Sequence, residues 1–386
     1  MKRWLDRSLG AIAMYKLVLG SLAALAVASI ALAFFDLISP DPFALLASLP
    51  VAVAFSCGAS WLGARIVRQR AHLESSVITG FLVFFIMAPS MQLDGLLAIA
   101  LASTVAAASK YLLAFRGRHI FNPAAIGAYV FIFVPLGFPT WWIGTPWLQP
   151  IIVVAAFLVL YRTQRLDLGL TFVVVAASIR IALTLANGGD LAEALSFTFA
   201  SSQMIFFVGF MLSEPLTLPP RRWQRLSLAV LVALLFAIPF SIGPVFSDPL
   251  LALLIGNLIA FAFTQRRTIR MSLVEKVELV PGTWELTFAP HRSISFRAGQ
   301  YIELSIPHAK ADFRGVRRYF TISSAPDAGG MISVTFTAPE KSSSFKAALL
   351  SLPRGSQVNA TGIWGDFVLP RNTDEPLLFV AGGIGV

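Results

Sequence analysis

The sequence predicts a polytopic α-helical membrane domain of about ten spans, followed by a small antiparallel β-barrel and the first strand of a Rossmann-like domain. Three observations support this prediction. Of the 386 residues, 56% are hydrophobic and only 13% are charged, which is the composition of a membrane protein. Apolar runs fill residues 12–265, separated by short polar joints. From residue 269 onward, charged and apolar residues alternate, which is typical of half-buried strands.

Each apolar run must satisfy its backbone hydrogen bonds internally, so each one predicts a helix. The expected spans are residues 12–35, 43–64, 73–91, 93–115, 123–138, 147–162, 168–187, 194–212, 226–243 and 248–265. Every second joint carries lysine or arginine, whereas the joints at 36–42, 88–95, 138–147, 187–193 and 241–249 carry neither. The positive-inside rule then places both ends in the cytoplasm, with the chain in a bacterial-type inner (cytoplasmic) membrane. An outer interfacial belt would contain Trp141, Trp142 and Trp147.

Composition also excludes several classes of function. The net charge of +10 does not predict a nucleic-acid partner, because the arginines are scattered between apolar runs rather than clustered on one face. The single cysteine, Cys57, excludes a disulfide framework and a cysteine-ligated iron–sulfur cluster within this chain. Stacked haems need four axial histidines, and two of the four here, His291 and His308, lie in the predicted barrel. No metal site is predicted.

Polar residues interrupt the apolar runs at three places. Arg180 lies within a predicted span, where it could hold an anionic cofactor group or pair with an acidic residue of another span. Asn122-Pro123 and Glu214-Pro215 both break a helix, and either polar residue could lie near a helix cap. Such groups are costly in hydrocarbon unless they line a cavity or meet a polar ligand. They therefore predict a ligand in the membrane domain.

Two segments resemble the NqrB/RnfD family of membrane subunits, found in sodium-pumping NADH:quinone reductase and the Rnf complex. They are Ser109-Lys110-Tyr111 with His119-Ile120-Phe121-Asn122-Pro123-Ala124-Ala125, and Phe210-Met211-Leu212-Ser213-Glu214-Pro215-Leu216-Thr217. The resemblance covers most of residues 80–265 and implies a flavin in the membrane domain. That family attaches FMN to a threonine in a Ser-Gly-Ala-Thr motif, whereas residues 185–195 contain no threonine, and Glu214 replaces the usual aspartate. The implied flavin is therefore noncovalent.

The stretch Arg318-Tyr319-Phe320-Thr321 combines an arginine, two aromatic residues and a hydroxyl. Residues two apart in a strand share a face, so Arg318 and Phe320 can point the same way, with Thr321 opposite unless the strand bends. A guanidinium can clamp a pyrophosphate, an aromatic ring can cover an isoalloxazine, and a hydroxyl can bond the ring edge. The alternative is a basic edge strand of a small barrel.

This stretch and three further motifs, in order, resemble the ferredoxin–NADP reductase superfamily. The others are Gly299-Gln300-Tyr301, the hydroxyl-rich helix start Ser342-Ser343-Ser344, and Gly362-Ile363-Trp364-Gly365-Asp366-Phe367. The resemblance implies an FAD-binding domain. Within it Arg318 would bind the FAD pyrophosphate, Ser343 or Ser344 the diphosphate, and Phe320 the flavin or its ribityl chain. Thr321 would lie near flavin N5 as the catalytic candidate, and Tyr319 belongs to the same cofactor-binding stretch.

The last residues, 378–386, read as a buried strand and a glycine turn containing Gly382, Gly383 and Gly385. They resemble the first strand and phosphate loop of the NAD(P)-binding domain in the same superfamily. Because such a domain needs about four more strands, we expect only its beginning here and no NAD(P)H activity from these 386 residues alone. The expected domains are 1–268 (membrane), 269–375 (FAD-binding) and 376–386 (start of the NAD(P)-binding domain).

These expectations combine into a membrane-bound oxidoreductase. Cytoplasmic NAD(P)H would reduce FAD, and electrons would pass to a membrane-domain cofactor or an unidentified acceptor, with lipid as the surrounding partner. A second possibility is a transporter or inert membrane anchor that carries a separate soluble flavin reductase, because broken helices suit a transporter equally well.

Overall fold

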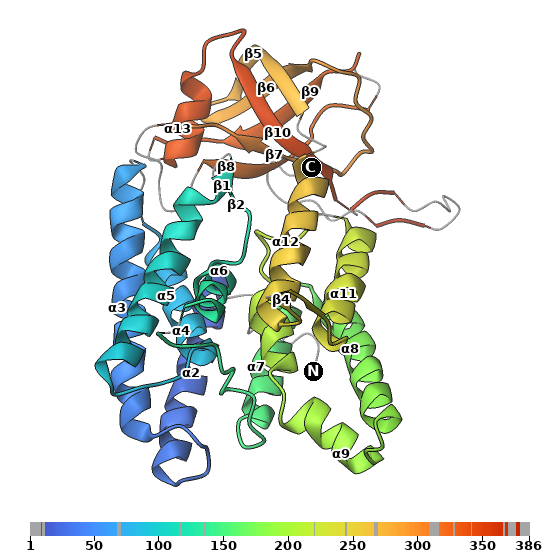
Figure 1. Cartoon of the computed structure of the whole chain (residues 1–386). Helices are drawn as coiled ribbons and strands as arrows, with labels where there is room; N and C mark the ends of the chain where they lie inside the picture. Colours follow the sequence, from blue (N-terminus) through green and yellow to red (C-terminus); the bar gives the residue numbers. More distant parts are fainter. Residues whose placement is uncertain are drawn as a thin grey trace. The chain divides into compact units, whose positions relative to one another are not determined.

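The computed structural model (Figure 1) places Leu9 and residues 12–67, 71–115, 118–134, 136–219, 221–243, 245–265, 269–308, 316–326, 329–340, 342–365, 367–369 and 376–378. The chain divides into two compact units. We call residues 1–67 with 71–261 the helical unit, and residues 68–70 with 262–386 the sheet unit. The predicted domain limits at 268 and 375 stay predictions.

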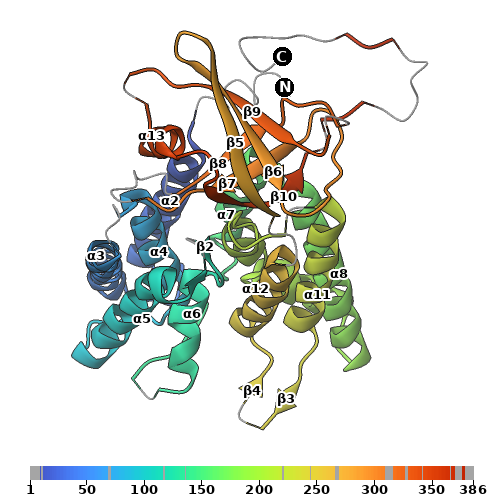
Figure 2. The same cartoon turned by 90° about the horizontal axis from the view of Figure 1, so that it is seen from above.

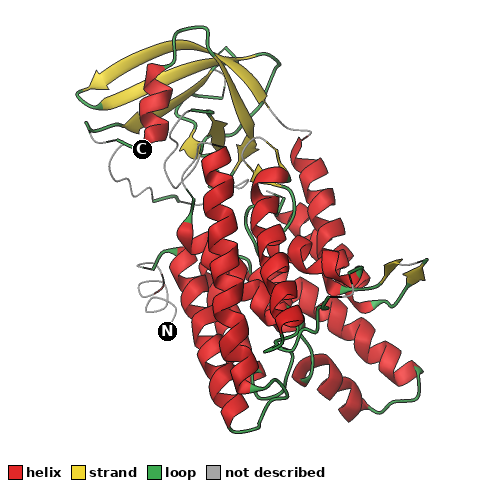
Figure 3. Ribbon diagram, turned by 60° about the vertical axis from the view of Figure 1, so that its left-hand side comes forward, coloured by secondary structure: helices red, strands yellow, loops and turns green. Residues whose placement is uncertain are grey.

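Helices cover part of each of the ten predicted spans. In chain order they are α2 (Met14–Phe34), α3 (Pro42–Ile66), α4 (Leu73–Ile86), α5 (Leu93–Leu112), α6 (Pro123–Tyr129), η1 (Val130–Ile132), α7 (Gln149–Arg162), α8 (Leu166–Ala186), α9 (Leu191–Leu195), η2 (Ser196–Ala200), α10 (Met204–Phe206), η3 (Phe207–Leu212), α11 (Arg222–Ala237) and α12 (Pro249–Gln265). Two-residue strands form two small hairpins, β1 (Ala114–Phe115) with β2 (Arg118–His119), and β3 (Ser241–Ile242) with β4 (Val245–Phe246). Figure 3 shows the helices lying side by side.

By length and composition, four of the described helices could cross a membrane: α2, α3, α5 and α8. A fifth candidate is the bent pair Leu191–Ala200 and Met204–Leu212, whose two parts meet at 43°. Helices such as α4, α7 and α12 are apolar but shorter. The structure therefore shows several apolar helices, and the count of ten spans stays a prediction.

Aromatic residues fill the core of the helical unit. Phe85 of α4 packs against Phe206 with ring centroids 5.4 Å apart, and Phe172 of α8 packs against Phe207 at the same distance. The prediction of an outer tryptophan belt is wrong for Trp141, which is buried. Trp142 is half-buried against the core, and its indole donates a hydrogen bond to the Phe84 carbonyl at 2.8 Å. Trp147 is exposed. For Trp142 and Trp147 the belt stays a prediction.

The sheet unit is an antiparallel sheet with one helix. Its strands are β5 (Ile269–Val280), β6 (Thr283–Pro290), β7 (Tyr301–Ser305), β8 (Arg317–Thr321), β9 (Ile332–Thr337) and β10 (Gln357–Trp364), in the spatial order β8-β7-β10-β5-β6-β9. Figure 2 shows β5 and β6 as the long pair, with α13 (Ser344–Ser351) beside the sheet. The predicted antiparallel strands are confirmed.

The two outer strands of the sheet approach each other at one point. Ile322, directly after β8, forms a bridge with Val334 of β9, and the Ser323 amide donates to the Ser333 carbonyl at 2.9 Å. Alternating residues of all six strands bury a common core that includes Phe288, Phe336 and the α13 residue Phe345. Closure into a complete barrel stays a prediction.

Candidate functional site

The Arg318-Tyr319-Phe320-Thr321 stretch forms most of β8, which pairs with β7 in the register Leu304 with Arg318 and Ile302 with Phe320. The guanidinium of Arg318 lies 5.4 Å from the ring centroid of Phe345. Phe320 stacks on the same ring, with centroids 6.0 Å apart and planes at 30°. Two residues of β8 therefore reach one side chain of α13, which confirms that Arg318 and Phe320 share a face of the strand.

The start of α13 lies beside this arginine. Ser343 is the N-cap of α13, and its hydroxyl accepts a hydrogen bond from the Lys346 amide at 3.4 Å. Ser344, the next residue, precedes Phe345 and has its hydroxyl 3.1 Å from Nε2 of His308. The structure thus links Arg318 and the Ser343–Ser344 pair through Phe345, although Ser343 lies 25 positions after Arg318 in the sequence.

The opposite face of β8 carries the exposed residues of the stretch. Tyr319 is 65% exposed and contacts Tyr301 edge to face at 5.5 Å, while Thr321 is exposed and pairs with Tyr301 across the sheet. Phe320 is only 7% exposed and packs against Phe336 as well as Phe345. Tyr319 is therefore the accessible ring of the stretch, and Phe320 belongs to the core.

Two glycine motifs meet next to this strand. The Gln300 side chain accepts from the Arg297 amide at 2.9 Å and donates to the Gly365 carbonyl at 3.3 Å, which joins the start of β7 to the end of β10. Gly299 has a φ of +90°, and a Cβ there would lie 1.8 Å from the Phe367 carbonyl oxygen, so only glycine fits. The predicted nucleotide-loop residues Gly382, Gly383 and Gly385 lie outside the described residues.

In the helical unit, the two helix-breaking motifs meet each other. Nε2 of His119 lies 2.7 Å from Oε1 of Glu214, and the Asn122 side-chain amide donates to Oε2 of Glu214 at 2.9 Å. The Asn122 carboxamide oxygen accepts from the Ala125 amide at 3.0 Å, and the Asn122 backbone amide donates to Asn257 at 2.7 Å. Asn122 and Glu214, which lie 92 positions apart in the sequence, are therefore joined by a hydrogen bond. We call His119, Asn122, Glu214 and Asn257 the polar junction.

The polar junction confirms one expectation and changes two. Asn122 is the N-cap of α6, as predicted. Glu214 caps no helix in the part of the chain that the structure describes, because it follows η3 and the next helix begins at Arg222. Moreover, both carboxylate oxygens of Glu214 already have partners within the chain. The prediction that these polar groups require a ligand is therefore not needed to explain them.

Arg180 lies in α8 and contacts hydroxyl and aromatic groups. Its guanidinium donates to the Ser202 hydroxyl at 3.0 Å and lies 4.5 Å from the ring centroid of Phe197 and 5.8 Å from that of Phe236. Among the described residues it forms no ion pair. The expected alternative of a pairing with an acidic residue of another span is not observed there.

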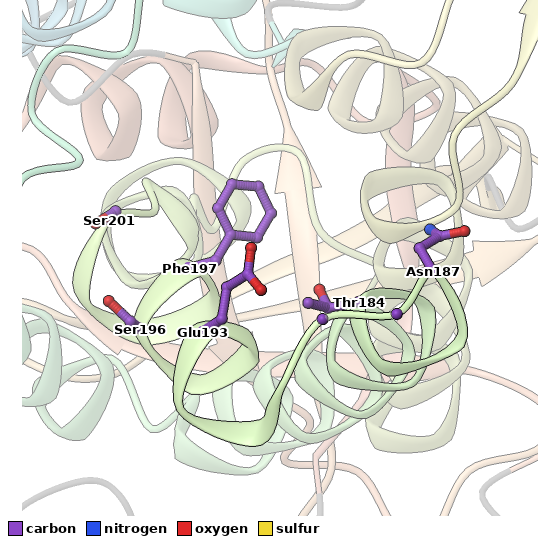
Figure 4. A pocket seen from close by; sticks show the side chains of 8 residues that line it. Thr184, Asn187, Glu193, Ser196, Phe197 and Ser201 are labelled. Carbon is purple, nitrogen blue, oxygen red and sulfur yellow. The ribbon is translucent and has the colours of Figure 1, made fainter.

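Arg180 lines a cleft of about 390 Å³ whose wall also includes Thr184, Asn187 and Phe197. These three residues also line a second cleft of about 670 Å³, together with Gly188, Gly189, Glu193, Ser196 and Ser201 (Figure 4). Figure 4 shows Glu193 and Phe197 close together, with Thr184 and Asn187 to one side. The two clefts therefore adjoin at the C-terminal end of α8.

Three contributors to these sites are not predicted from the sequence: His308, Phe345 and Asn257. His308 enters the sequence analysis only in the exclusion of haem, and Asn257 lies in an apolar run. Each contributes by a contact to a residue far along the chain. The sequence does offer one signal for Asn257, because a polar residue inside an apolar run often has a polar partner.

No protein-family model matches the chain. Curated relatives match over about 30% of it. Phenol hydroxylase P5 protein of Acinetobacter pittii is 26% identical over 115 residues, 30% of this chain and 31% of that protein. The reductase subunit of an Amycolatopsis aromatic O-demethylase is 25% identical over 31% of this chain and 36% of that protein. Ferredoxin–NADP reductase B of Sorangium cellulosum is 33% identical over 30% of this chain and 46% of that protein. The chain thus spans about a third to a half of the length of these relatives.

Solved structures match the chain with low TM-scores. The Amycolatopsis cytochrome P450 reductase GcoB is 24% identical over 28% of this chain and 32% of its own, with a TM-score of 0.25. A Malassezia yamatoensis flavohemoglobin with bound FAD and heme is 14% identical over 57% of this chain and 64% of its own, with a TM-score of 0.26. The sequence relatives are of the ferredoxin–NADP reductase type, and this part of the prediction is confirmed. None of the comparisons shows the NqrB/RnfD-type membrane domain.

Proposed function

We propose that this chain belongs to a membrane-bound, flavin-dependent oxidoreductase. Electrons from cytoplasmic NAD(P)H pass through FAD in the sheet unit to a cofactor or acceptor of the helical unit. The observation that carries the proposal is that Arg318 lies over Phe345, the residue that directly follows the Ser343–Ser344 pair at the start of α13. The reductase-type relatives of the chain support it.

The residues at this meeting point fit the diphosphate of FAD. Arg318 supplies a guanidinium, which binds phosphate through paired N–H groups, and its position is supported by the Phe345 ring. Ser343 and Ser344 supply hydroxyls at a helix start, where backbone amides also favour an anion. Each of these groups can donate a hydrogen bond, as an anionic ligand requires. We assign the diphosphate of FAD to them.

The isoalloxazine is assigned to the other face of β8. Tyr319 presents an exposed ring and Thr321 an exposed hydroxyl on this face. Phe320, which the motif resemblance assigns to the flavin, instead supports Phe345 from the core. When bound, FAD accepts a hydride from NAD(P)H and hands the electrons on. In this assignment Tyr319 orients the ring and Thr321 offers a hydrogen bond to its edge.

A membrane setting for the helical unit is supported by its outward surface. Large apolar side chains are exposed on several helices, among them Leu97, Leu101, Val153, Val154, Phe157, Leu170 and Val174. Water-facing helices rarely present apolar surface of this extent. We propose that lipid covers these faces, with both ends of the chain cytoplasmic and the inner membrane as its location.

The adjoining clefts at Arg180 are the proposed site of a second, noncovalent flavin. Arg180 offers a cation beside the exposed Phe197 ring, which suits a ligand with an anionic group and a flat ring. Thr184 also lines both clefts, but its hydroxyl donates to the Arg180 carbonyl at 3.0 Å and residues 185–195 contain no threonine. The ligand is therefore proposed to be held without a covalent bond.

The test of the FAD site uses the full chain in detergent, with FAD content and affinity as readouts. Arg318→Ala removes charge-assisted hydrogen bonds worth about 1.5–3 kcal/mol, so FAD affinity should fall by about tenfold to a hundredfold. Arg354→Ala is the matched control, because Arg354 is an exposed arginine of the same unit that forms an ion pair with Glu275 at 3.6 Å. Full FAD affinity in Arg318→Ala would reject the site.

The alternative of a transporter or anchor with a separate reductase predicts a different flavin distribution. If it holds, Arg180→Ala leaves the flavin content of gently extracted protein unchanged, because only the sheet unit binds flavin. The nucleotide site is assigned to Gly382, Gly383 and Gly385 in our proposal.

A further inference from the structure

His308 lies just after β7, and two hydrogen bonds fix its ring. Nδ1 lies 2.8 Å from the Ile306 carbonyl oxygen, and Nε2 lies 3.1 Å from the Ser344 hydroxyl. The ring also meets Phe345 edge to face, with centroids 6.3 Å apart. His308 therefore touches both residues that follow the N-cap of α13, beside the ring on which Arg318 rests.

The Ile306 carbonyl determines which protons the imidazole can hold. A carbonyl oxygen only accepts, so Nδ1 must carry a hydrogen. In the neutral ring, Nε2 then has a lone pair, and the single hydroxyl hydrogen of Ser344 must point at it. In the imidazolium, Nε2–H donates to the Ser344 oxygen instead, and the hydroxyl hydrogen can turn to another acceptor. The protonation state of His308 thus decides whether Ser344 can donate to a phosphate oxygen.

The elements next to α13 carry several charged groups. Arg318 of β8 lies over Phe345, and Lys346 of α13 has its ammonium 5.8 Å from the Phe336 ring centroid. On β7, the carboxylate of Glu303 is 3.4 Å from Arg317 of β8. A diphosphate bound at Ser344 would bring negative charge next to the His308 ring, and a nearby negative charge favours the protonated form of an imidazole.

We propose that His308 is a positioning residue for the FAD diphosphate and that it takes up a proton when FAD binds. The inference rests on the proposed FAD site. Because the protonated ring adds a cation and no longer requires the Ser344 hydroxyl hydrogen as a donor, FAD binding and proton binding strengthen each other. FAD therefore binds more tightly at low pH.

The size of the effect follows from linkage. One linked proton limits the change in FAD Kd to about tenfold per pH unit, in the range where an imidazole titrates, roughly pH 6–8. Riboflavin lacks the diphosphate, so its affinity should not change across this range. The comparison of the two ligands separates an effect at the diphosphate from a general effect of pH on the protein.

The experiment titrates the full chain in detergent with FAD and with riboflavin from pH 6 to 8. We expect the Kd for FAD to rise severalfold over this range in the unmodified chain and to be flat in His308→Gln. The matched control is His291→Gln, since His291 is also a sheet-unit histidine bonded to a serine hydroxyl, that of Ser272 at 2.8 Å. His291→Gln should keep the pH dependence.

A flat FAD titration in the unmodified chain, or an unchanged slope in His308→Gln, would overturn the inference while leaving the FAD site intact. If the chain binds no FAD at any pH, the proposed function itself fails. Should His308→Gln not fold, calorimetry of FAD binding to the unmodified chain in buffers of different ionisation enthalpy replaces it. Net proton uptake near pH 7 supports the inference, and no uptake rejects it.

Discussion

The site in the sheet unit and the polar junction in the helical unit were both found through sequence motifs, but they use their polar groups differently. At the polar junction, Glu214 accepts from His119 and Asn122, so both of its oxygens are occupied by the chain itself. In the sheet unit, the Arg318 guanidinium and the α13 hydroxyls lie around Phe345 without a carboxylate among them, and we propose that they donate to a ligand. A motif rich in polar residues can thus either bind a ligand or lock two segments together, and the balance of donors and acceptors distinguishes the two.

The largest expected effect separates packing from binding within one strand. Phe320→Ala removes a buried ring that packs against Phe336 and Phe345, and the lost burial should destabilise the sheet unit by about 3–5 kcal/mol. Tyr319→Ala, on the exposed face, should cost little stability but weaken FAD binding. Hydrogen exchange of the β8 and β9 amides measures the first effect and flavin titration the second. An unchanged exchange rate in Phe320→Ala would mean that the ring is not part of the core.

The next effect tests whether the clefts at Arg180 bind a ligand. Arg180→Ala removes a cation from a site proposed for an anionic group, which should weaken the bound flavin by about 1.5–3 kcal/mol, tenfold or more in affinity. Arg162→Ala, at the C-terminal end of α7, is a control, because its half-buried side chain donates to the Ile12 carbonyl at 3.2 Å and does not line either cleft in the described residues. Flavin retained by gently extracted Arg180→Ala protein would make Arg180 a structural residue like those of the polar junction.

The contrast between the two sites fails if the polar junction binds a ligand. Glu214→Ala leaves His119 and the Asn122 amide without their shared acceptor, so the helical unit should lose about 1–3 kcal/mol, with its flavin content unchanged. Glu214→Gln keeps one oxygen as an acceptor and should lose less. Loss of stability is followed by hydrogen exchange in α6 and η3. Flavin loss at unchanged stability would convert the junction into a binding site.

The features predicted correctly from the sequence are those that depend on residues close to one another in the chain. Apolar runs and residue alternation are local signals, and they correctly located helix in each predicted span and strands from residue 269 onward. The face shared by Arg318 and Phe320 also follows from strand geometry alone. These features need no knowledge of which segments pack together.

Predictions that required a tertiary partner fared worse. Trp141 and Trp142 look like interface residues in a short polar joint, yet Trp141 is buried and Trp142 packs against the core of the helical unit. Glu214 looks like a ligand-binding or capping group until Asn122 and His119 are seen beside it. His308 gives no local sign that Ser344, 36 residues later, lies against its ring. In each case the deciding contact joins residues far apart in sequence.

The smallest expected effect concerns Thr321, the residue that the motif resemblance singles out as catalytic. Its exposed hydroxyl can offer the flavin edge one hydrogen bond between neutral groups, worth about 0.5–1.5 kcal/mol. Thr321→Ala should therefore lower FAD affinity only severalfold, far less than Arg318→Ala, because the latter removes a charged donor. Thr321→Ser keeps the hydroxyl and should bind FAD like the unmodified chain. Titration of the three variants side by side gives the order, and the absorbance spectrum of bound FAD reports the ring environment. If Thr321→Ala weakened FAD as much as Arg318→Ala while Thr321→Ser did not, the hydroxyl would contribute as much as the guanidinium, and the assignment of a single neutral hydrogen bond to Thr321 would be wrong.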